Sequence, residues 1–364
     1  MNTVGNNIKI TFFGESHGPF IGIVIDNLPA GLKIDEDLLR NNLQKRRPAK
    51  KINTNRIETD EYQFVSGYYN GFTTGAALTV LIPNKNTISK DYKTFNNIPR
   101  PSHADYPAYV KYKGFNDTRG GGFFSGRLTT LWIIIGSISE QILKKYNIYI
   151  GSHIYSLKNI KDDSFDFISN DVKQLKELNA QSFPLLNHDK KEAMFSLIKS
   201  VKEAKNSIGG IVESKIVNIP VGLGEPYFLS IESYISNLLF SVPGVKGVEF
   251  GKGFDITANY GSEMNDSYHI ENNKIKTTSN NNGGILGGLS TGMPIIIKTA
   301  FKPTSSIGIK QNSVDLKNNK NTTIEISGRH DPQYVSRTPI VVNSILSFVI
   351  LDFLMFKLKE NVLS

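Results

Sequence analysis

The 364-residue chain contains no cysteine, and it has only six histidines and one tryptophan. The absence of cysteine excludes disulfide frameworks, thiolate zinc sites, iron–sulfur clusters and a cysteine nucleophile. It is also typical of proteins that work in a reducing compartment. The remaining composition, 39% hydrophobic and 21% charged, is that of a globular protein and excludes disorder as the main state.

Long apolar runs are scarce as well. One segment, 339–356, approaches the roughly 18 to 20 residues of a membrane-spanning helix. Its polar residues Asn343, Ser344, Ser347 and Asp352 predict a buried helix of a core or subunit interface instead. The N-terminal residues lack the basic start, apolar stretch and cleavage site of a secretory signal. We therefore expect a cytoplasmic protein that is not held in a membrane, and import into an organelle stays open.

Acidic residues are outnumbered by basic ones, 33 against 42, which gives a formal net charge of +9. Such an excess favours anionic partners: phosphates, carboxylates, nucleic acid or an anionic membrane surface. A nucleic-acid-binding protein would carry basic residues interleaved with aromatic ones along one face. Here the arginines lie in loops rich in glycine and histidine. We therefore expect a small, multiply anionic ligand and no nucleic acid.

Hydrophobic periodicity predicts a mixed α/β chain and no more than that. Short β-branched runs between turns predict strands at 8–13, 20–25, 76–82, 211–219, 245–258 and 294–299. Apolar residues at helical spacing predict helices after an Asp35 cap, after a Ser125 cap, over 194–201, over 231–239 and from about 339. Residues 99–127 are expected to form an ordered loop, and residues 154–190 a peripheral insertion without chemistry.

Half of the histidines lie in three loops that also carry hydroxyl, carboxylate or arginine side chains, at 14–18, 100–106 and 328–332. Histidine suits proton transfer near neutral pH, so these loops are candidates for acid–base catalysis. His153, His188 and His269 lie in polar contexts that indicate no role. We expect no metal site, because the His-x-x-x-His and Glu-x-x-His spacings are absent.

Arginine and glycine concentrate around the same loops. Guanidinium groups bind phosphates and carboxylates in a bidentate manner, and the candidates are Arg46, Arg47, Arg100, Arg119, Arg127, Arg329 and Arg337. The triplet Gly120–Gly122 ahead of a predicted helix can present backbone N–H groups to an anion. Lys302 and the hydroxyls that follow it suit a phosphate too. Each signal alone is unspecific, and structural salt bridges remain an alternative for each arginine.

Taken in order, these motifs resemble the chorismate synthase family over nearly the whole chain. The resemblance rests on Gly-Glu-Ser-His-Gly at 14–18, Arg-Arg-Pro at 46–48, His-Ala-Asp-Tyr at 103–106, Asp-x-Arg-Gly-Gly-Gly at 117–122, Ser-x-Arg at 125–127, Gly-Leu-Gly-Glu-Pro at 222–226, Val-Lys-Gly-Val-Glu at 245–249, Gly-Gly-Ile-Leu-Gly-Gly at 283–288, Lys-Pro-Thr-Ser-Ser at 302–306 and Gly-Arg-His-Asp-Pro at 328–332. It implies a single catalytic domain over 1–364, with β-sheets sandwiched with helices, and a homotetramer.

The resemblance also implies the reaction, which is anti 1,4-elimination of phosphate from 5-enolpyruvylshikimate 3-phosphate to give chorismate. The cofactor would be reduced FMN, with no net redox change. NADPH would enter only as a reductant of the flavin, and because no extra domain for that task is evident, we expect an external flavin reductase. The alternative is a flavin-binding relative in which elimination is impaired or lost.

The resemblance further assigns roles to single positions. His17 matches the acid near the leaving phosphate, His103 the group that protonates the reduced flavin, and Asp331, with Ser16 and Ser125, the residues of deprotonation through the flavin N5. The substrate-binding positions are Arg46, Lys51, Arg100, Arg127 and Arg329. The flavin-contact positions are Phe123, Phe124, Ser125, Pro243, Gly244, Gly287, Lys302, Pro303, Thr304, Ser305, Ser306 and Arg329.

Two positions depart from the family pattern. Phe123 stands where the family often has arginine, and Lys51 is the nearest candidate for a second substrate arginine. Lysine keeps the charge but loses the bidentate fork, and phenylalanine keeps neither. Pro243 and Gly244 also differ from the usual flavin-contact pair, although a backbone contact would survive. We expect weaker binding of FMN or substrate than in a typical member.

Overall fold

The computed structural model describes residues 2–47, 59–85, 97–326 and 331–363. The helices are α1 (Glu36–Arg46), α2 (Asp105–Lys111), α3 (Thr129–Lys145), α4 (Val172–Ala180), α5 (Lys190–Glu203), α6 (Ile231–Leu239), α7 (Gly261–Met264) and α8 (Pro339–Leu363). Short 3-10 helices are η2 (Arg119–Phe124), η3 (Gly126–Leu128), η4 (Tyr227–Leu229), η5 (Gly253–Ala258) and η6 (Val335–Arg337).

The first of two five-stranded antiparallel sheets has the order β1-β2-β3-β7-β4. Its strands are β1 (Thr3–Val4), β2 (Lys9–Gly14), β3 (Phe20–Asp26), β7 (Leu78–Pro83) and β4 (Gln63–Ser66). In the central strand β3, Ile21, Ile23 and Ile25 are fully buried while Val24 lies between them on the other face. This period of two directs one apolar face of the sheet into the core.

The second five-stranded sheet has the order β11-β16-β10-β8-β9. Its strands are β11 (Val245–Phe250), β16 (Ile295–Phe301), β10 (Gly210–Val217), β8 (Tyr149–Leu157) and β9 (Ile160–Lys161). Residues 212–217 of β10 are buried without alternation, so both faces of the central strand are covered. Two-stranded pairs complete the chain: β5 (Tyr68–Tyr69) with β6 (Phe72–Thr73), β12 (Tyr268–Glu271) with β13 (Lys274–Thr277), β14 (Ile285–Leu286) with β15 (Leu289–Ser290), and β17 (Gln311–Asp315) with β18 (Lys320–Ile324).

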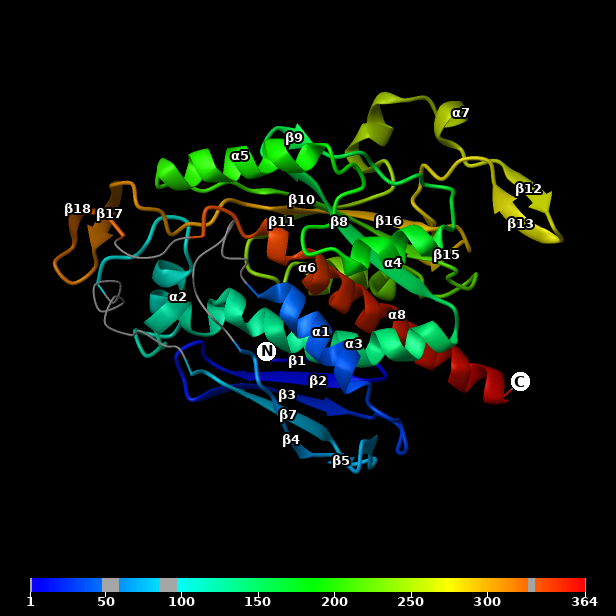
Figure 1. Ribbon diagram of the computed structural model, residues 1–364, viewed down its shortest axis with the longest axis horizontal. Coiled ribbons are helices and arrows are strands. Elements are labelled where there is room, and N and C mark those ends of the chain that lie inside the picture. The colour runs from blue at the N-terminus through cyan, green and yellow to red at the C-terminus, as the bar shows by residue number, and fades with distance from the viewer. Residues whose placement is uncertain (1, 48–58, 86–96, 327–330, 364) are drawn as a thin grey trace.

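Helices α1, α3 and α8 lie between the two sheets, and α5 covers the outer side of the second sheet (Figure 1). One hydrophobic core runs through the molecule and takes residues from both sheets and from the helices between them. Helices α3 and α8 approach closely, since a Cβ built on Gly136 would lie 2.2 Å from the Ser344 Cβ. The expected arrangement of β-sheets sandwiched with helices is confirmed.

The C-terminal helix α8 contains the apolar segment Pro339–Phe356, which is long and apolar enough to cross a membrane by composition alone. Of this segment, 83% is buried inside the protein. Asp352 is buried too, and it accepts hydrogen bonds from the backbone N–H groups of Asn6, Asn7 and Ile8. The prediction of a buried core helix is confirmed.

Three sequence-based expectations need correction. Residues 99–127 are not only loop, because α2 and η2 form within them. The predicted strand 245–258 ends at Phe250, where Gly251 takes a φ of +56° and η5 follows. The proposed insertion 154–190 begins inside β8, a strand of the second sheet, where Ile154 and Leu157 belong to the main core.

Candidate active site

Two turns of the site, at residues 14–18 and 119–122, are hydrogen-bonded to each other. Ser16 donates from its backbone N–H to the Gly122 carbonyl (3.1 Å) and from its hydroxyl to the Gly120 carbonyl (3.1 Å). A Cβ on Gly120 would lie 2.2 Å from the His17 imidazole, so only glycine permits this approach. His17 itself is buried, with 6% of its surface exposed. The Gly-rich segment therefore closes over His17.

The same glycines bring together residues from two further loops. Gly120, Gly121 and Gly122 all have positive φ, so the backbone winds in a way that other residues resist. A Cβ on Gly121 would lie 3.5 Å from the His103 Nε2 and 3.9 Å from the Ser125 Cβ. The Ser125 hydroxyl accepts from the Arg127 N–H (3.2 Å) and caps η3, which leads into α3. The predicted cap at Ser125 is confirmed.

His103 lies between an arginine and a carboxylate. Its Nδ1 is 2.6 Å from Asp105 Oδ1 and 3.1 Å from Arg100 Nη2. The short contact with a carboxylate favours the tautomer with hydrogen on Nδ1, which leaves Nε2 as the nitrogen that exchanges a proton. Burial and the Arg100 charge lower the pKa of His103 despite the bond to Asp105. His103 is therefore neutral at pH 7 when no anion is bound.

Arg100 is held by Asp105 and faces the Lys302–Ser306 loop. Asp105 Oδ2 accepts from Arg100 Nε (2.8 Å), and Arg100 Nη1 donates to the Ser306 hydroxyl (3.4 Å). Burial alone would raise the pKa of Asp105, but the bonds from Arg100 and His103 outweigh it and lower the pKa. Lys302 donates through Nζ to the Ser102 carbonyl. These contacts gather cationic and hydroxyl groups beside His103.

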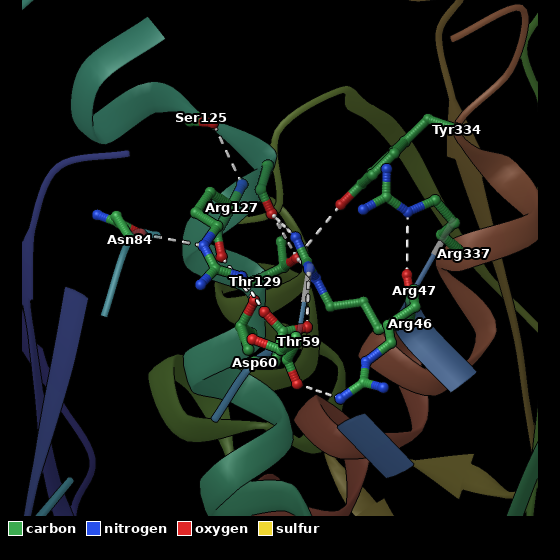
Figure 2. A network of polar contacts seen from close by, with 12 residues as sticks. Arg46, Arg47, Thr59, Asp60, Asn84, Ser125, Arg127, Thr129, Tyr334 and Arg337 are labelled. Carbon is green, nitrogen blue, oxygen red and sulfur yellow. Dashed lines mark hydrogen bonds and ion pairs between the residues drawn. The ribbon is translucent and has the colours of Figure 1, made fainter. Parts of the chain in front are cut away.

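A second polar cluster, to which Ser125 is linked through the Arg127 N–H, surrounds Asp60 (Figure 2). Arg46 is buried, and it donates to the Thr129 hydroxyl (3.0 Å) and the Gly126 carbonyl (2.9 Å). Arg127 donates to the Asn84 Oδ1 (3.2 Å) and to Asp60. Arg46 Nη1 also lies 3.7 Å from the Asp60 carboxylate, so this carboxylate stands between the two arginines.

Asp331 is joined to both clusters. Its carboxylate lies 3.3 Å from Arg337 Nη1, and its carbonyl accepts from the Thr304 hydroxyl (2.9 Å). Arg337 also donates to the Arg46 carbonyl (3.0 Å) and lies over the Tyr334 ring. The arginine therefore ties the end of α1 to the segment that carries Asp331.

A cavity of about 880 Å³ opens next to Ser125. Pro243 lines the cavity, and its aromatic walls include Phe12, Phe13, Tyr112, Phe115, Phe123, Phe124 and Trp132. Phe123 packs on Phe124 with ring centroids 4.8 Å apart. Polar residues line the cavity as well, among them Ser125, Thr129, Glu15 and Asp117. A cleft with aromatic walls and polar groups is typical of a site for a planar, partly apolar ligand.

Most of the predicted site residues lie within or beside these contacts. Gly244 joins them through its carbonyl, which accepts from the Lys302 N–H (2.8 Å). Gly287 lies in the turn between β14 and β15, where a Cβ would meet nothing within 4 Å. Pro303 and Ser305 belong to the Lys302–Ser306 loop. The candidates Lys51 and Arg329 fall outside the described residues.

Sequence reasoning did not single out three residues of the site: Asp60, Asn84 and Tyr334. Their partners are far away in the sequence or lie in loops without periodicity. The spacing of residues along the chain therefore does not predict their contacts. The only available signal was charge, since a site with this many arginines requires carboxylates to balance it. Among the described residues, no group of three or more His, Asp and Glu side chains could hold a metal ion.

Fold and site together bring several arginines and two histidines to one place, an arrangement typical of enzymes that act on anionic substrates. The family model for chorismate synthase matches residues 8–355. The chain is 41% identical to chorismate synthase of Korarchaeum cryptofilum, with 98% of each chain covered, and 42% identical to that of Pyrococcus abyssi, with 97% of each covered. It is 43% identical to chorismate synthase of Methanobrevibacter smithii, with 96% of this chain and 95% of the relative covered.

A solved structure described as the crystal structure of chorismate synthase matches with a TM-score of 0.75 at 24% identity, and it covers 98% of this chain and 94% of that one. This likeness supports the fold. The chain belongs to the chorismate synthase family. None of these relatives carries a name that favours the alternative of a flavin-binding protein without this activity.

Proposed function

We propose that this protein eliminates phosphate from 5-enolpyruvylshikimate 3-phosphate in the anti 1,4 sense and releases chorismate, as a carbon–oxygen lyase acting on phosphates. The observation that carries the proposal is the meeting of His17, His103 and Ser125 around one glycine triplet, with arginines on both sides. A substrate with one phosphate and two carboxylates requires this density of guanidinium groups.

The residues fit reduced FMN as the cofactor. The aromatic cavity with Phe123, Phe124 and Pro243 suits a flavin ring, and the hydroxyls of the Lys302–Ser306 loop, with the Lys302 ammonium, suit its phosphate. Gly244, Gly287 and Arg329 complete the proposed set. When bound, the reduced flavin supplies a transient electron that helps the phosphate to leave, without net redox change.

The protein side chains supply protons and charge. His17 donates a proton to the departing phosphate, which lowers the charge of the leaving group. His103 exchanges a proton at Nε2, because the Asp105 carboxylate holds the hydrogen on Nδ1. Asp331, held by Arg337, is the group that accepts and keeps the proton, and the hydroxyls of Ser16 and Ser125 relay it, each giving up one proton as it takes another. Arg100, Arg127 and Arg329, with Lys51, bind the substrate anions. The resemblance assigns Arg46 to the same set, although its side chain is only 2% exposed.

The working form would be a cytoplasmic homotetramer of single-domain subunits. An external flavin reductase would supply reduced flavin and would take its electrons from NADPH. Two exposed aromatic residues before α6, Tyr227 and Phe228, support association, because they are 86% and 95% exposed. Adjacent exposed aromatic side chains are typical of protein interfaces.

The test is an anaerobic assay with 5-enolpyruvylshikimate 3-phosphate, FMN and dithionite, in which phosphate and chorismate are measured together. Equal amounts of both products are expected. Bound FMN without either product would instead support the alternative, a flavin-binding relative that has lost elimination. Phosphate without chorismate would indicate hydrolysis and contradict the proposed reaction.

A further inference from the structure

Asp60 is a buried carboxylate to which the sequence analysis assigned no role. It lies ahead of β4, and its side chain is fully buried. Its φ is +47°, a left-handed conformation that residues other than glycine adopt rarely. A buried charge in an uncommon backbone conformation is retained where its surroundings fix it.

The two arginines that face Asp60 differ in accessibility. The Arg46 side chain is 2% exposed, and its guanidinium is directed at Thr129, the Gly126 carbonyl and Asp60, all inside the protein. The Arg127 side chain is 10% exposed and is held by Asp60 at one end and by Asn84 through Nε. Figure 2 shows Asp60 between the two guanidinium groups. Of the two arginines, Arg127 is the one placed to meet a ligand.

We propose that Asp60 is a positioning residue, which orients Arg127 toward the anionic substrate, and that Arg46 fixes Asp60 from behind rather than binding substrate. This inference rests on the proposed function. It assigns Arg46 a structural task, whereas the family resemblance places it among the substrate-binding residues. Two effects compete when Asp60 loses its charge: the site becomes more positive, and Arg127 loses its anchor. Orientation dominates, because a bidentate contact with a phosphate or carboxylate requires a fixed guanidinium plane.

The test is Asp60→Asn, a replacement of nearly the same shape. The KM for 5-enolpyruvylshikimate 3-phosphate should rise about tenfold while kcat changes less than twofold. The dissociation constant of the same ligand, measured by calorimetry on protein loaded with oxidised FMN, should rise by the same factor. In an Arg127→Lys background the same substitution should change the KM less than twofold, because Asp60 acts through Arg127.

Asp352→Asn is the matched control. It removes the charge of another buried carboxylate, one bonded to Tyr234 and the backbone of residues 6–8, and should lower stability without changing the KM. A wild-type KM in Asp60→Asn, a lower KM, or an equally large effect in the Arg127→Lys background would overturn the inference. If Asp60→Asn does not fold, Asp60→Glu keeps the charge but displaces it, and the same KM criteria apply. A wild-type protein that makes no chorismate would instead contradict the proposed function.

Discussion

At the scale of single residues, the two histidines of the site are the first to test. His17→Ala and His103→Ala should each slow chorismate formation by roughly ten- to a thousandfold, because each removes a positioned group that transfers a proton. FMN should still bind to both variants. Anaerobic turnover and quenching of flavin fluorescence measure the two properties. Wild-type turnover in both variants would refute their proton roles, and His188→Gln, at a position remote from the site loops in sequence, is the control.

His103 also makes a prediction about protons taken up on binding. Burial and Arg100 lower its pKa, so it is deprotonated at pH 7.5 in the free protein. A polyanion bound nearby favours the charged imidazolium and raises the pKa. Binding of 5-enolpyruvylshikimate 3-phosphate should therefore take up a proton, as calorimetry in buffers of different ionisation enthalpy would detect. His103→Gln should lack this uptake, and equal uptake in both proteins would contradict the assignment.

Phe123 tests the departure from the family pattern. It packs on Phe124 at the wall of the aromatic cavity and is 40% exposed, so an arginine there has room to reach solvent or an anion. Phe123→Arg should lower the dissociation constant of FMN several-fold through a charge-assisted contact. Phe123→Met is the control that removes the ring without adding charge. An unchanged constant in Phe123→Arg would show that this position is tolerated.

At the scale of structural elements, the sequence predicts a helix or strand correctly where that element has its own capping residue or hydrophobic periodicity. The Asp35 side chain accepts from the Leu38 N–H (2.9 Å), and α1 begins there as predicted. Helix α2 was missed because Pro107 and the surrounding loop residues conceal a short helix of seven residues. Asp60 was missed for another reason: its partners are Arg46 and Arg127, and only the fold brings them together.

Strand β8 contains the clearest error of interpretation. His153 was expected in a polar context without a role, yet it is fully buried between Asp162 (2.8 Å) and Glu213 (3.0 Å). Asp162 also accepts from the backbone of Leu186 and Asn187, and Glu213 from that of Phe165. The three charged side chains therefore fasten residues 162–187 to the second sheet.

The contacts of His153 with Asp162 and Glu213 predict how the free energy of unfolding depends on pH. Burial would lower the pKa of His153, but the bonds to Asp162 and Glu213 outweigh it and raise the pKa. The stabilisation is complete below the unfolded pKa of about 6.5 and is lost as pH rises through the folded pKa. Urea unfolding from pH 6 to 10 should show this loss in the wild type and not in His153→Gln, which should be about 3 kcal/mol less stable at pH 6. Lys298, 4.0 Å from Glu213, remains as a local cation.

His269→Gln, on the exposed strand β12, is the control for that series. It should follow the wild-type curve. If His153→Gln loses stability with pH as steeply as the wild type, another group carries the dependence.

At the scale of the whole molecule, the two sheets and the helices between them explain why loops far apart in sequence form one site. Family resemblance, and not composition, predicted that residues 14 to 331 meet, since periodicity alone gave a mixed α/β chain. The physical cause of the meeting is the continuous core from Ile8 to Leu354, which fixes both sheets against α3 and α8. The positions of these loops relative to one another depend on that packing. They therefore cannot be predicted from the pattern of residues along a single segment.

The proposed homotetramer is the prediction that belongs to this scale. Phe228 is 95% exposed beside Tyr227, and burying such a pair between subunits removes apolar surface from water. Analytical ultracentrifugation should give four times the 40.5 kDa chain mass for the wild type and a smaller species for Phe228→Asp, because a buried unpaired carboxylate opposes association. Lys199→Asp, on the exposed side of α5, changes charge without touching aromatic surface and should stay tetrameric. A tetramer that persists in Phe228→Asp would place the interface elsewhere, and a monomeric wild type would contradict the tetramer itself.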